Sequence, residues 1–243
     1  MREAGRIVGQ VLQRMTEWVA PGVTTRELDR AAEELIRRRG GRPAFLGQTA
    51  PGRPPFPGTV CTSVNDEVVH GIPGPRVLRE GDIVSIDVGV EYQGLFGDTA
   101  VTLPVGRVSR QARVLMRVCA EALDRAIAQV RPGNTVGDIG RTVQQHVEAH
   151  GFSVVRDFVG HGIGTVLWQA PEVPNFVSPR AAKTVMEPGL VLAIEPMINA
   201  GRYDVRADAD DLWVVRTVDG QLAAHFEHTV AVTPDGHEVL TLP

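Results

Sequence analysis

The sequence predicts an α+β protein in which helices cover one face of a curved antiparallel sheet. A segment that opens with Pro-Gly and a capping threonine occurs twice, 111 residues apart at Pro21 and Pro132, and an aliphatic strand that ends on an acid also occurs twice. Neither repeat alone could cover its apolar face or its sheet edge. We therefore expect a single domain, residues 1–243, made of two related halves (about 1–105 and 106–243) with pseudo-two-fold symmetry.

The helices are predicted from their apolar spacing and their caps. Each half opens with a helix-like stretch, at about 2–19 and 108–130. A second helix follows, with an acid three residues after its capping threonine, as in a capping box, and a glycine at its end. The threonine, acid and glycine are Thr24, Glu27 and Gly40 in the first half, and Thr135, Asp138 and Gly151 in the second.

The repeated strands are GDIVSID at 81–87 and GLVLAIE at 189–195. The first strand continues into a hairpin, DVGVEYQGLFGD. If its turn is the four residues from 91 to 94, Asp87 lies directly opposite Asp98 on the same face. Two buried carboxylates at that distance repel one another unless one binds a proton or a cation lies between them.

The second half repeats this arrangement. Glu195 ends the strand at 189–195, and Glu227 lies on the small-residue face of a strand expected at 221–233. Four acids from two symmetric halves could hold two divalent ions. Oxygen ligands favour hard or borderline metals, and one imidazole shifts the preference toward Mn, Fe or Co.

Three histidines have informative contexts. His161 lies in GHGIG, a glycine-bracketed turn that lets an imidazole protrude and that does not fit a phosphate-binding loop. His146 and His150 have the i, i+4 spacing of a metal clamp, but we interpret them as solvated residues near an outer helix end. The Pro-rich stretch 42–58 is either a surface loop or the rim of a site.

Composition excludes several classes of protein. The net charge is −4, and no basic run is long enough to suggest nucleic-acid binding. No stretch of 18 apolar residues predicts a membrane span, the N-terminus does not resemble a signal peptide, and two cysteines form no disulfide framework. We expect a monomer in the cytoplasm.

Segments along nearly the whole chain resemble the type I methionine aminopeptidases, metallopeptidases with a pita-bread fold. The resemblance rests on the combination and order of these segments, which is far more specific than any one of them. They are MREAGRIV, PGVTTRELD, PAFLG, VCTSVNDEVVHGIP, GDIVSIDVG, GDTA, GHGIG, PEVPNFV, AIEPMINAG and FEHTVAVT.

The resemblance implies roles for individual residues. His70 matches a histidine that contacts substrate, and Glu195 matches a ligand that also carries a proton. The matching residues of the methionine pocket are Phe56, Cys61 and Trp213. Two divalent ions (Co, Mn, Fe or Zn) would be bound by Asp87, Asp98, His161, Glu195 and Glu227.

The chain departs from the family pattern after GHGIG. Trp168 stands where the family has a second active-site histidine, and Gln169 stands where it has Glu. An indole N–H can donate a hydrogen bond but can neither accept one nor carry a proton. Leu167 and Arg53 occupy pocket and rim positions where the family often has aromatics. Metal binding is expected to be intact and substrate handling altered.

The expected function is removal of the N-terminal methionine from peptides or nascent chains, by a hydroxide held between two metal ions, with reduced or altered activity because of Trp168. Ribosome association would fit such a role. One alternative is a weakly active or inactive pita-bread paralogue that binds peptides or a protein partner. Another is a proline-specific or amidino-hydrolysing relative of the same fold, although those usually carry a large extra N-terminal domain.

Overall fold

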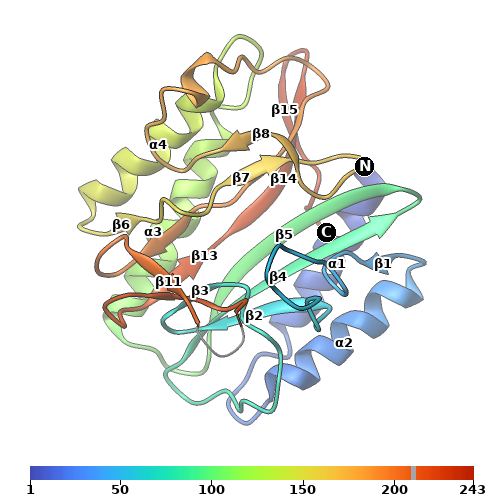
Figure 1. Ribbon diagram of the computed structural model, residues 1–243, viewed down its shortest axis with the longest axis vertical. Coiled ribbons are helices and arrows are strands. Elements are labelled where there is room, and N and C mark those ends of the chain that lie inside the picture. The colour runs from blue at the N-terminus through green and yellow to red at the C-terminus, as the bar shows by residue number, and fades with distance from the viewer. Residues whose placement is uncertain (209–211) are drawn as a thin grey trace.

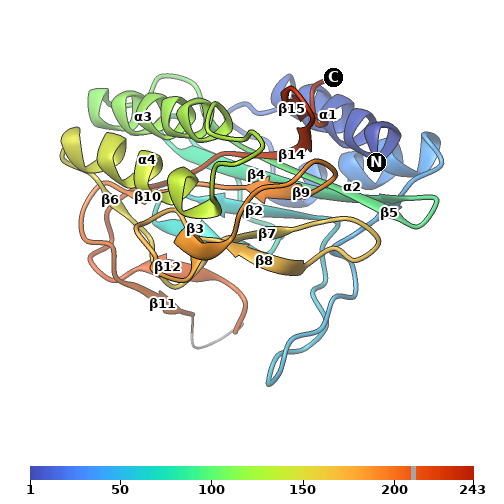
Figure 2. The same cartoon turned by 90° about the horizontal axis from the view of Figure 1, so that it is seen from above.

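The computed structural model describes residues 1–208 and 212–243. Its helices lie on one side of a large sheet, while the Pro-rich loop and a pair of short strands project from the other (Figures 1 and 2). None of the helices in the described residues is both long and apolar enough to cross a membrane. The helices are α1 (Arg2–Thr16), α2 (Thr25–Arg38), α3 (Arg110–Ile127), α4 (Val136–Ala149) and the short 3-10 helix η1 (Ala181–Lys183).

The strands form one large and two small sheets, and every strand pair among the described residues is antiparallel. The expected α+β class is confirmed. The strands of the large sheet are β1 (Arg42–Pro43), β2 (Val60–Val64), β4 (Ile83–Tyr92), β5 (Leu95–Pro104), β7 (Gly160–Gly162), β8 (Gln169–Val173), β9 (Val191–Ile194), β14 (Glu227–Thr233) and β15 (Gly236–Val239).

The order along the large sheet is β1-β4-β5-β14-β9-β7-β8, with β2 paired to β4 and β15 paired to β14. One small sheet packs against α3 and α4 beside the large sheet, and the other lies on the side away from the helices (Figure 2). One contains β13 (Ala223–His225), β10 (Met197–Asn199) and β6 (Ser153–Val154), and the other contains β11 (Val205–Ala207), β12 (Val215–Thr217) and β3 (Glu67–Val69).

The predicted caps of α2 and α4 are present. The backbone N–H of Thr24 donates to the Glu27 carboxylate at 2.7 Å, and the Thr135 N–H donates to Asp138 at the same distance. Each acid satisfies a backbone donor that the helix start leaves unpaired. The glycines that follow each helix take left-handed backbone angles, with φ of +75° at Gly40 and +77° at Gly151.

Two apolar clusters fill the space between the helices and the large sheet. The first joins α1 and α2 to β2 and β4 through residues such as Ile36 and Ile86, and the second joins α3 and α4 to β9 and β14 through residues such as Val143 and Leu192. We still infer two related halves, about 1–105 and 106–243, and these clusters support that inference.

The hairpin of β4 and β5 has a tighter turn than the sequence analysis expected. Its two turn residues, Gln93 and Gly94, have φ of +53° and +78°, as in the two-residue turns that match strand twist. Asp87 therefore pairs with Ala100, and the expected direct pairing of Asp87 with Asp98 is wrong. The two acids still share a face because strand side chains alternate with a period of two, and they are diagonal neighbours.

The strand expected over 221–233 is broken at Phe226. Its first part, β13, pairs with β10 in a small sheet, whereas β14 runs through the middle of the large sheet. The break turns the chain from one sheet into the other, and it places Glu227 at the first position of β14.

Candidate metal centre

Five neighbouring strands each bring one possible metal ligand to the face of the large sheet that the helices leave free. The neighbours of Asp87, Ile86 and Val88, are buried against α1 and α2, so the alternation of the strand points Asp87 to the opposite face. In spatial order the residues are Asp87 on β4, Asp98 on β5, Glu227 on β14, Glu195 directly after β9 and His161 on β7.

These side chains converge in space although their sequence separation is large. Ligand atoms of Asp98, His161 and Glu227 all lie within 4.8 Å of one another. The Nε2 atom of His161 lies 3.6 Å from Glu195 Oε1. Buried oxygens of Asp87, Asp98 and Glu227 have no hydrogen-bond partner. Buried carboxylate oxygens without a hydrogen-bond partner are suited to binding a cation.

Threonine hydroxyls hold the backbone that carries two of these acids. The Thr229 hydroxyl accepts a hydrogen bond from the Asp98 N–H at 3.0 Å and donates to the Asp98 carbonyl oxygen at 2.8 Å. The Thr99 hydroxyl donates to the Glu227 carbonyl oxygen at 2.7 Å. Strands β5 and β14 are thus joined side by side where their acids emerge, which fixes the separation of the two carboxylates.

The glycines that bracket His161 are required by close packing of strands. A Cβ at Gly160 would lie 2.3 Å from the Ala193 carbonyl oxygen, and a Cβ at Gly162 would lie 2.3 Å from that of Ala170. The imidazole is oriented by its Nδ1–H, which donates to the Gly162 carbonyl oxygen at 2.9 Å. Its Nε2 lone pair is therefore available to bind a cation held by the neighbouring acids.

Burial raises the pKa of all four acids, and repulsion from neighbouring carboxylates adds to the shift in three of them. Burial, with a contribution from Glu195, raises the pKa of Asp87 to about 7, although His225 opposes the shift. Burial also raises the pKa of Glu195 to about 7, against the influence of His161. Burial and the neighbouring carboxylates raise the pKa of Asp98 and of Glu227 well above the usual range. The site thus favours bound protons or cations over bare negative charge.

The acids form the floor of a cavity of about 290 Å³ with an apolar side. Of the five pocket residues expected from the sequence, Phe56, Cys61, Trp168 and Trp213 line it. Leu167 is buried in the same apolar cluster but does not line the cavity. The Pro-rich stretch supplies part of the rim, which answers the question that its sequence left open.

Trp213 is held in place by this rim. Its indole Nε1–H donates to the Pro54 carbonyl oxygen at 2.8 Å, and its ring meets Phe56 edge-on at 5.3 Å between centroids. The Arg53 guanidinium lies 5.1 Å from the Trp213 ring centroid. A cation therefore packs at the rim position where an aromatic was expected.

His70 lies at the edge of the cavity in a strained backbone conformation. Its φ is +61°, unusual for a residue with a side chain. The ring packs edge-on against Phe158 and Trp213, and its buried Nδ1 has no hydrogen-bond partner. Burial and the nearby Arg53 lower the pKa of His70 to about 4, so its imidazole is neutral at physiological pH.

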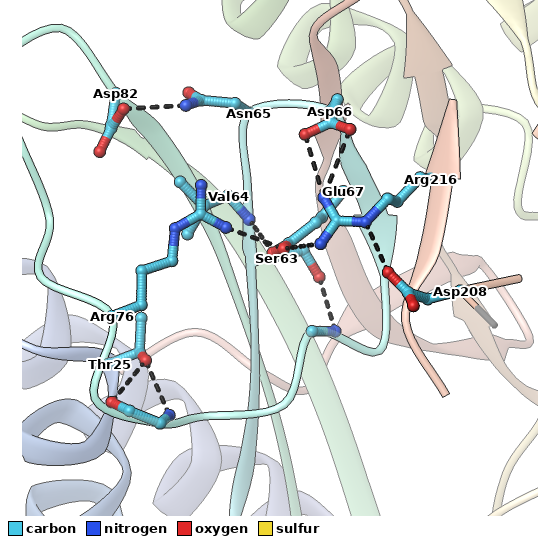
Figure 3. Close-up of polar contacts among 12 residues, drawn as sticks. Thr25, Ser63, Val64, Asn65, Asp66, Glu67, Arg76, Asp82, Asp208 and Arg216 are labelled. Carbon is cyan, nitrogen blue, oxygen red and sulfur yellow. Dashed lines mark hydrogen bonds and ion pairs between the residues drawn. The ribbon is translucent and has the colours of Figure 1, made fainter. Parts of the chain in front are cut away.

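A charged network fixes the wall that carries His70 and Trp213 (Figure 3). Arg216 on β12 donates to Asp66, Glu67 and Asp208, and Arg76 also donates to Glu67 at 2.8 Å. The Glu67 carboxylate is buried between the two guanidiniums. These bonds join β12 to β3, so His70, which follows β3, and Trp213, which precedes β12, keep a fixed separation.

Trp168 lies at the mouth of the cavity. The residue is 47% exposed, and its ring meets that of His161 edge-on at 6.5 Å between centroids. The following residue, Gln169, is exposed and begins β8. Trp168 therefore lies beside the candidate metal centre, but its side chain is a bulky, largely apolar ring.

Sequence reasoning missed one residue beside the acids. His225 is buried, and its Nε2, 3.7 Å from Glu195 Oε2, has no hydrogen-bond partner. Burial lowers the pKa of His225. Its position two residues before Glu227, on the same strand period, was the signal that could have revealed it.

The match to known proteins agrees with this geometry. The model of metallopeptidase family M24 matches residues 1–234, and the chain belongs to that family. It is 50% identical to a methionine aminopeptidase of Clostridium perfringens over 242 residues, which is 100% of this chain and 94% of that protein. It is 45% identical to methionine aminopeptidase 1 of Bacillus subtilis, over 99% of this chain and 94% of the relative.

The fold is also that of solved members of the family. The crystal structure of methionine aminopeptidase from Thermotoga maritima superposes with a TM-score of 0.95 at 41% identity, covering 100% of this chain and 95% of that one. The expected pita-bread fold is therefore confirmed.

Proposed function

We propose that this protein removes the N-terminal methionine from peptides or nascent chains in a metal-dependent reaction. The observation that carries the proposal is the convergence of one ligand-type side chain from each of five adjacent strands on an apolar-sided cavity. Relatives at 45–50% identity over almost the whole chain are methionine aminopeptidases.

We infer that Asp87, Asp98, His161, Glu195 and Glu227 hold two divalent ions. The unpartnered buried oxygens and the raised pKa values of the acids support this assignment. Mostly oxygen ligands with one imidazole suit Co, Mn, Fe or Zn. When bound, such ions polarise a carbonyl and lower the pKa of water toward neutrality.

Two residues of the chain would handle charge and protons during peptide hydrolysis. A neutral His70 can donate a hydrogen bond to the scissile carbonyl oxygen, where negative charge develops. The Glu195 carboxylate can accept a proton from the attacking water and pass it to the leaving amine. Both groups lie at the cavity.

The apolar side of the cavity fits an unbranched thioether side chain. Phe56, Cys61 and Trp213 line it, and Leu167 packs behind them. A methionine side chain is flexible and polarizable, and it packs well against aromatic edges. These residues would select the substrate's first residue.

Trp168 favours a second candidate, a pita-bread paralogue that binds peptides with weak or no catalysis. Its indole lies at the mouth, where an imidazole could have accepted a hydrogen bond or carried a proton. The retained set of buried acids favours catalysis, because buried carboxylates without a cation are costly.

The setting of the activity completes the proposal. Nascent chains carry the substrate methionine, so we propose that the protein acts in the cytoplasm, beside the ribosome. We also propose that it acts as a monomer. Sedimentation of the purified protein with and without ribosomes would test both the monomer and the association.

A cleavage assay tests the central activity. Purified protein treated with chelator would be reloaded with Co²⁺, Mn²⁺, Fe²⁺ or Zn²⁺ and incubated with Met-Ala-Ser. Release of free methionine that depends on the added ion supports the peptidase. Tight peptide binding without release, at every ion, supports the binding paralogue.

A further inference from the structure

A second cluster of metal-ligand side chains lies where α3 and α4 pack against each other. It combines Glu121 of α3 with His146 and His150 of α4, and one ligand atom of each lies within 4.8 Å of the others. These helices cover the face of the large sheet opposite the cavity (Figure 2). Our interpretation of both histidines as solvated is wrong for His146, whose side chain is only 8% exposed.

Each of the three side chains keeps one ligand atom free. The His150 Nδ1–H donates to the His146 carbonyl oxygen at 2.8 Å, which leaves the Nε2 lone pair available. The Glu121 Oε1 accepts from Arg117 at 2.8 Å, which leaves Oε2. The buried His146 Nε2 lies 3.2 Å from that Oε2 but has no partner with hydrogen-bond geometry.

An ion pair does not account for this arrangement. Burial, with Arg125 and His150 nearby, lowers the pKa of His146, although Glu121 opposes the shift. A neutral imidazole is the form that binds metals. In the tautomer that carries its proton on Nδ1, the buried Nε2 lone pair of His146 faces a carboxylate oxygen, and a cation between the two atoms would relieve this contact.

We propose that Glu121, His146 and His150 form a second transition-metal site, separate from the peptidase centre. Two imidazoles one helical turn apart, with ring centroids 4.6 Å from each other, suit Zn²⁺, Ni²⁺ or Cu²⁺ better than hard ions. Ligand atoms about 2.1 Å from a tetrahedral ion lie about 3.4 Å apart, close to the 3.2 Å between His146 and Glu121. Solvent would complete the coordination at the exposed His150.

The bound ion would link the two helices directly. Apart from the contact of His146 with Glu121, α3 and α4 meet mainly through the apolar cluster beneath them. An ion held by α3 and by the last turn of α4 adds a connection that binds only the folded state, and it therefore raises stability. Arg125 lies close enough to disfavour positive charge at His146, which limits the affinity.

Zinc binding by variants tests the site. His150 is exposed, so His150→Ala should fold normally, and His237→Ala removes another exposed histidine as the matched control. The chelator-treated wild-type protein titrated with Zn²⁺ alone should bind one equivalent more than His150→Ala, and Glu121→Gln should weaken that equivalent by about 10-fold or more. His237→Ala should match the wild type.

Two further readouts separate this site from the peptidase centre. With Cu²⁺, electron paramagnetic resonance should show nitrogen hyperfine splitting from two imidazoles in Asp98→Asn and from fewer in Asp98→Asn/His150→Ala. His150→Ala should keep wild-type methionine release, because it removes only the second metal site. The peptidase centre can therefore be tested independently of it. Equal zinc stoichiometry and equal thermal shifts in wild type and His150→Ala would overturn the proposal.

Discussion

Asp98 and Glu227 emerge side by side from β5 and β14, and their carboxylates share a space within 4.8 Å with the imidazole of His161. Both are almost fully buried, at 3% and 2% exposure, and each has an oxygen without a hydrogen-bond partner. Two buried negative charges at this separation destabilise the fold unless protons or cations neutralise them.

Replacing Asp98 should have opposite effects on the metal-free and metal-loaded protein. Asp98→Asn removes one repelling charge, so the metal-free protein should unfold at the same temperature or higher. It also removes a ligand, so the added stability from Mn²⁺, about 2.7 kcal/mol at 100 times the dissociation constant, should largely disappear. Thermal melts with chelator and with Mn²⁺ measure both. A variant that keeps the full metal-induced shift would contradict the assignment.

The stability of the metal-free protein should fall as pH rises from about 4 to above 7. Unfolded carboxyls lose their protons near pH 4, whereas the raised pKa values of Asp87 and Glu195, about 7 each, keep these groups protonated in the folded state. The folded state therefore binds more protons in this window, and its stability is lost as pH passes through the folded pKa.

Urea unfolding in chelator across this pH range measures the effect. Saturating Mn²⁺ should reverse the trend, because bound metal requires deprotonated ligands and its stabilisation grows with pH. If stability changed with pH in the same way with and without Mn²⁺, protons and metal ions would not bind the same carboxylates, and the assignment would be contradicted.

Trp168→His should raise methionine release. An imidazole can accept a hydrogen bond or carry a proton at the cavity mouth, where the indole can only donate. One well-placed hydrogen-bond donor is typically worth about 10²–10³ in rate, which sets the upper limit of the gain. Steady-state kinetics on Met-Ala-Ser measure it, with Trp168→Phe as the control for size. Unchanged or slower turnover in the histidine variant would show that this position does not limit the chemistry.

Arg216→Met should destabilise the protein and loosen the wall of the pocket. It leaves the buried Glu67 with only Arg76 as a charged partner, and we expect a loss of about 2 kcal/mol. The matched control is Arg107→Met, because the pair of Arg107 with Glu80 is largely exposed and should contribute less than about 1 kcal/mol.

Urea denaturation compares the two variants, and the KM for Met-Ala-Ser should rise in Arg216→Met because Trp213 and His70 depend on this wall. Equal losses of stability in both variants would mean that the network has no special role.

The parts of the fold that follow from local rules were predicted well. The capping boxes at Thr24 and Thr135 are short-range patterns, and both helices begin where those patterns place them. The glycines at 40 and 151 end the same helices for a local reason, the left-handed backbone angle. Repetition of such signals was enough to indicate the helical layer and the sheet beneath it.

Register and tertiary contacts were harder to predict. The turn at Gln93 and Gly94 is one of two possible turns in the same sequence, and a turn two residues shorter shifts every cross-strand pair. The break at Phe226 exists because the chain changes sheets there, which no local pattern encodes. The His146 side chain is shielded from solvent because α3 packs against its turn of α4, so its spacing alone suggested a solvated residue.

The candidate site was predicted through alternation and repetition rather than through distances. Asp87 and Glu227 were placed correctly on faces because a strand has a period of two, and that argument survives an error of two residues in register. Alternation could have placed His225 on the same face as Glu227, but its contact with Glu195 also depends on how β13 and β14 diverge, which no local pattern encodes.

The most direct measurement is a crystal structure of the protein soaked with Mn²⁺, with diffraction data collected for the anomalous signal of manganese. Our account predicts two anomalous peaks in the cavity, contacted by Asp87, Asp98, His161, Glu195 and Glu227. Absence of peaks there at saturating Mn²⁺, or a single peak that Asp87 and Glu195 do not contact, would contradict the two-ion centre on which the proposed reaction depends.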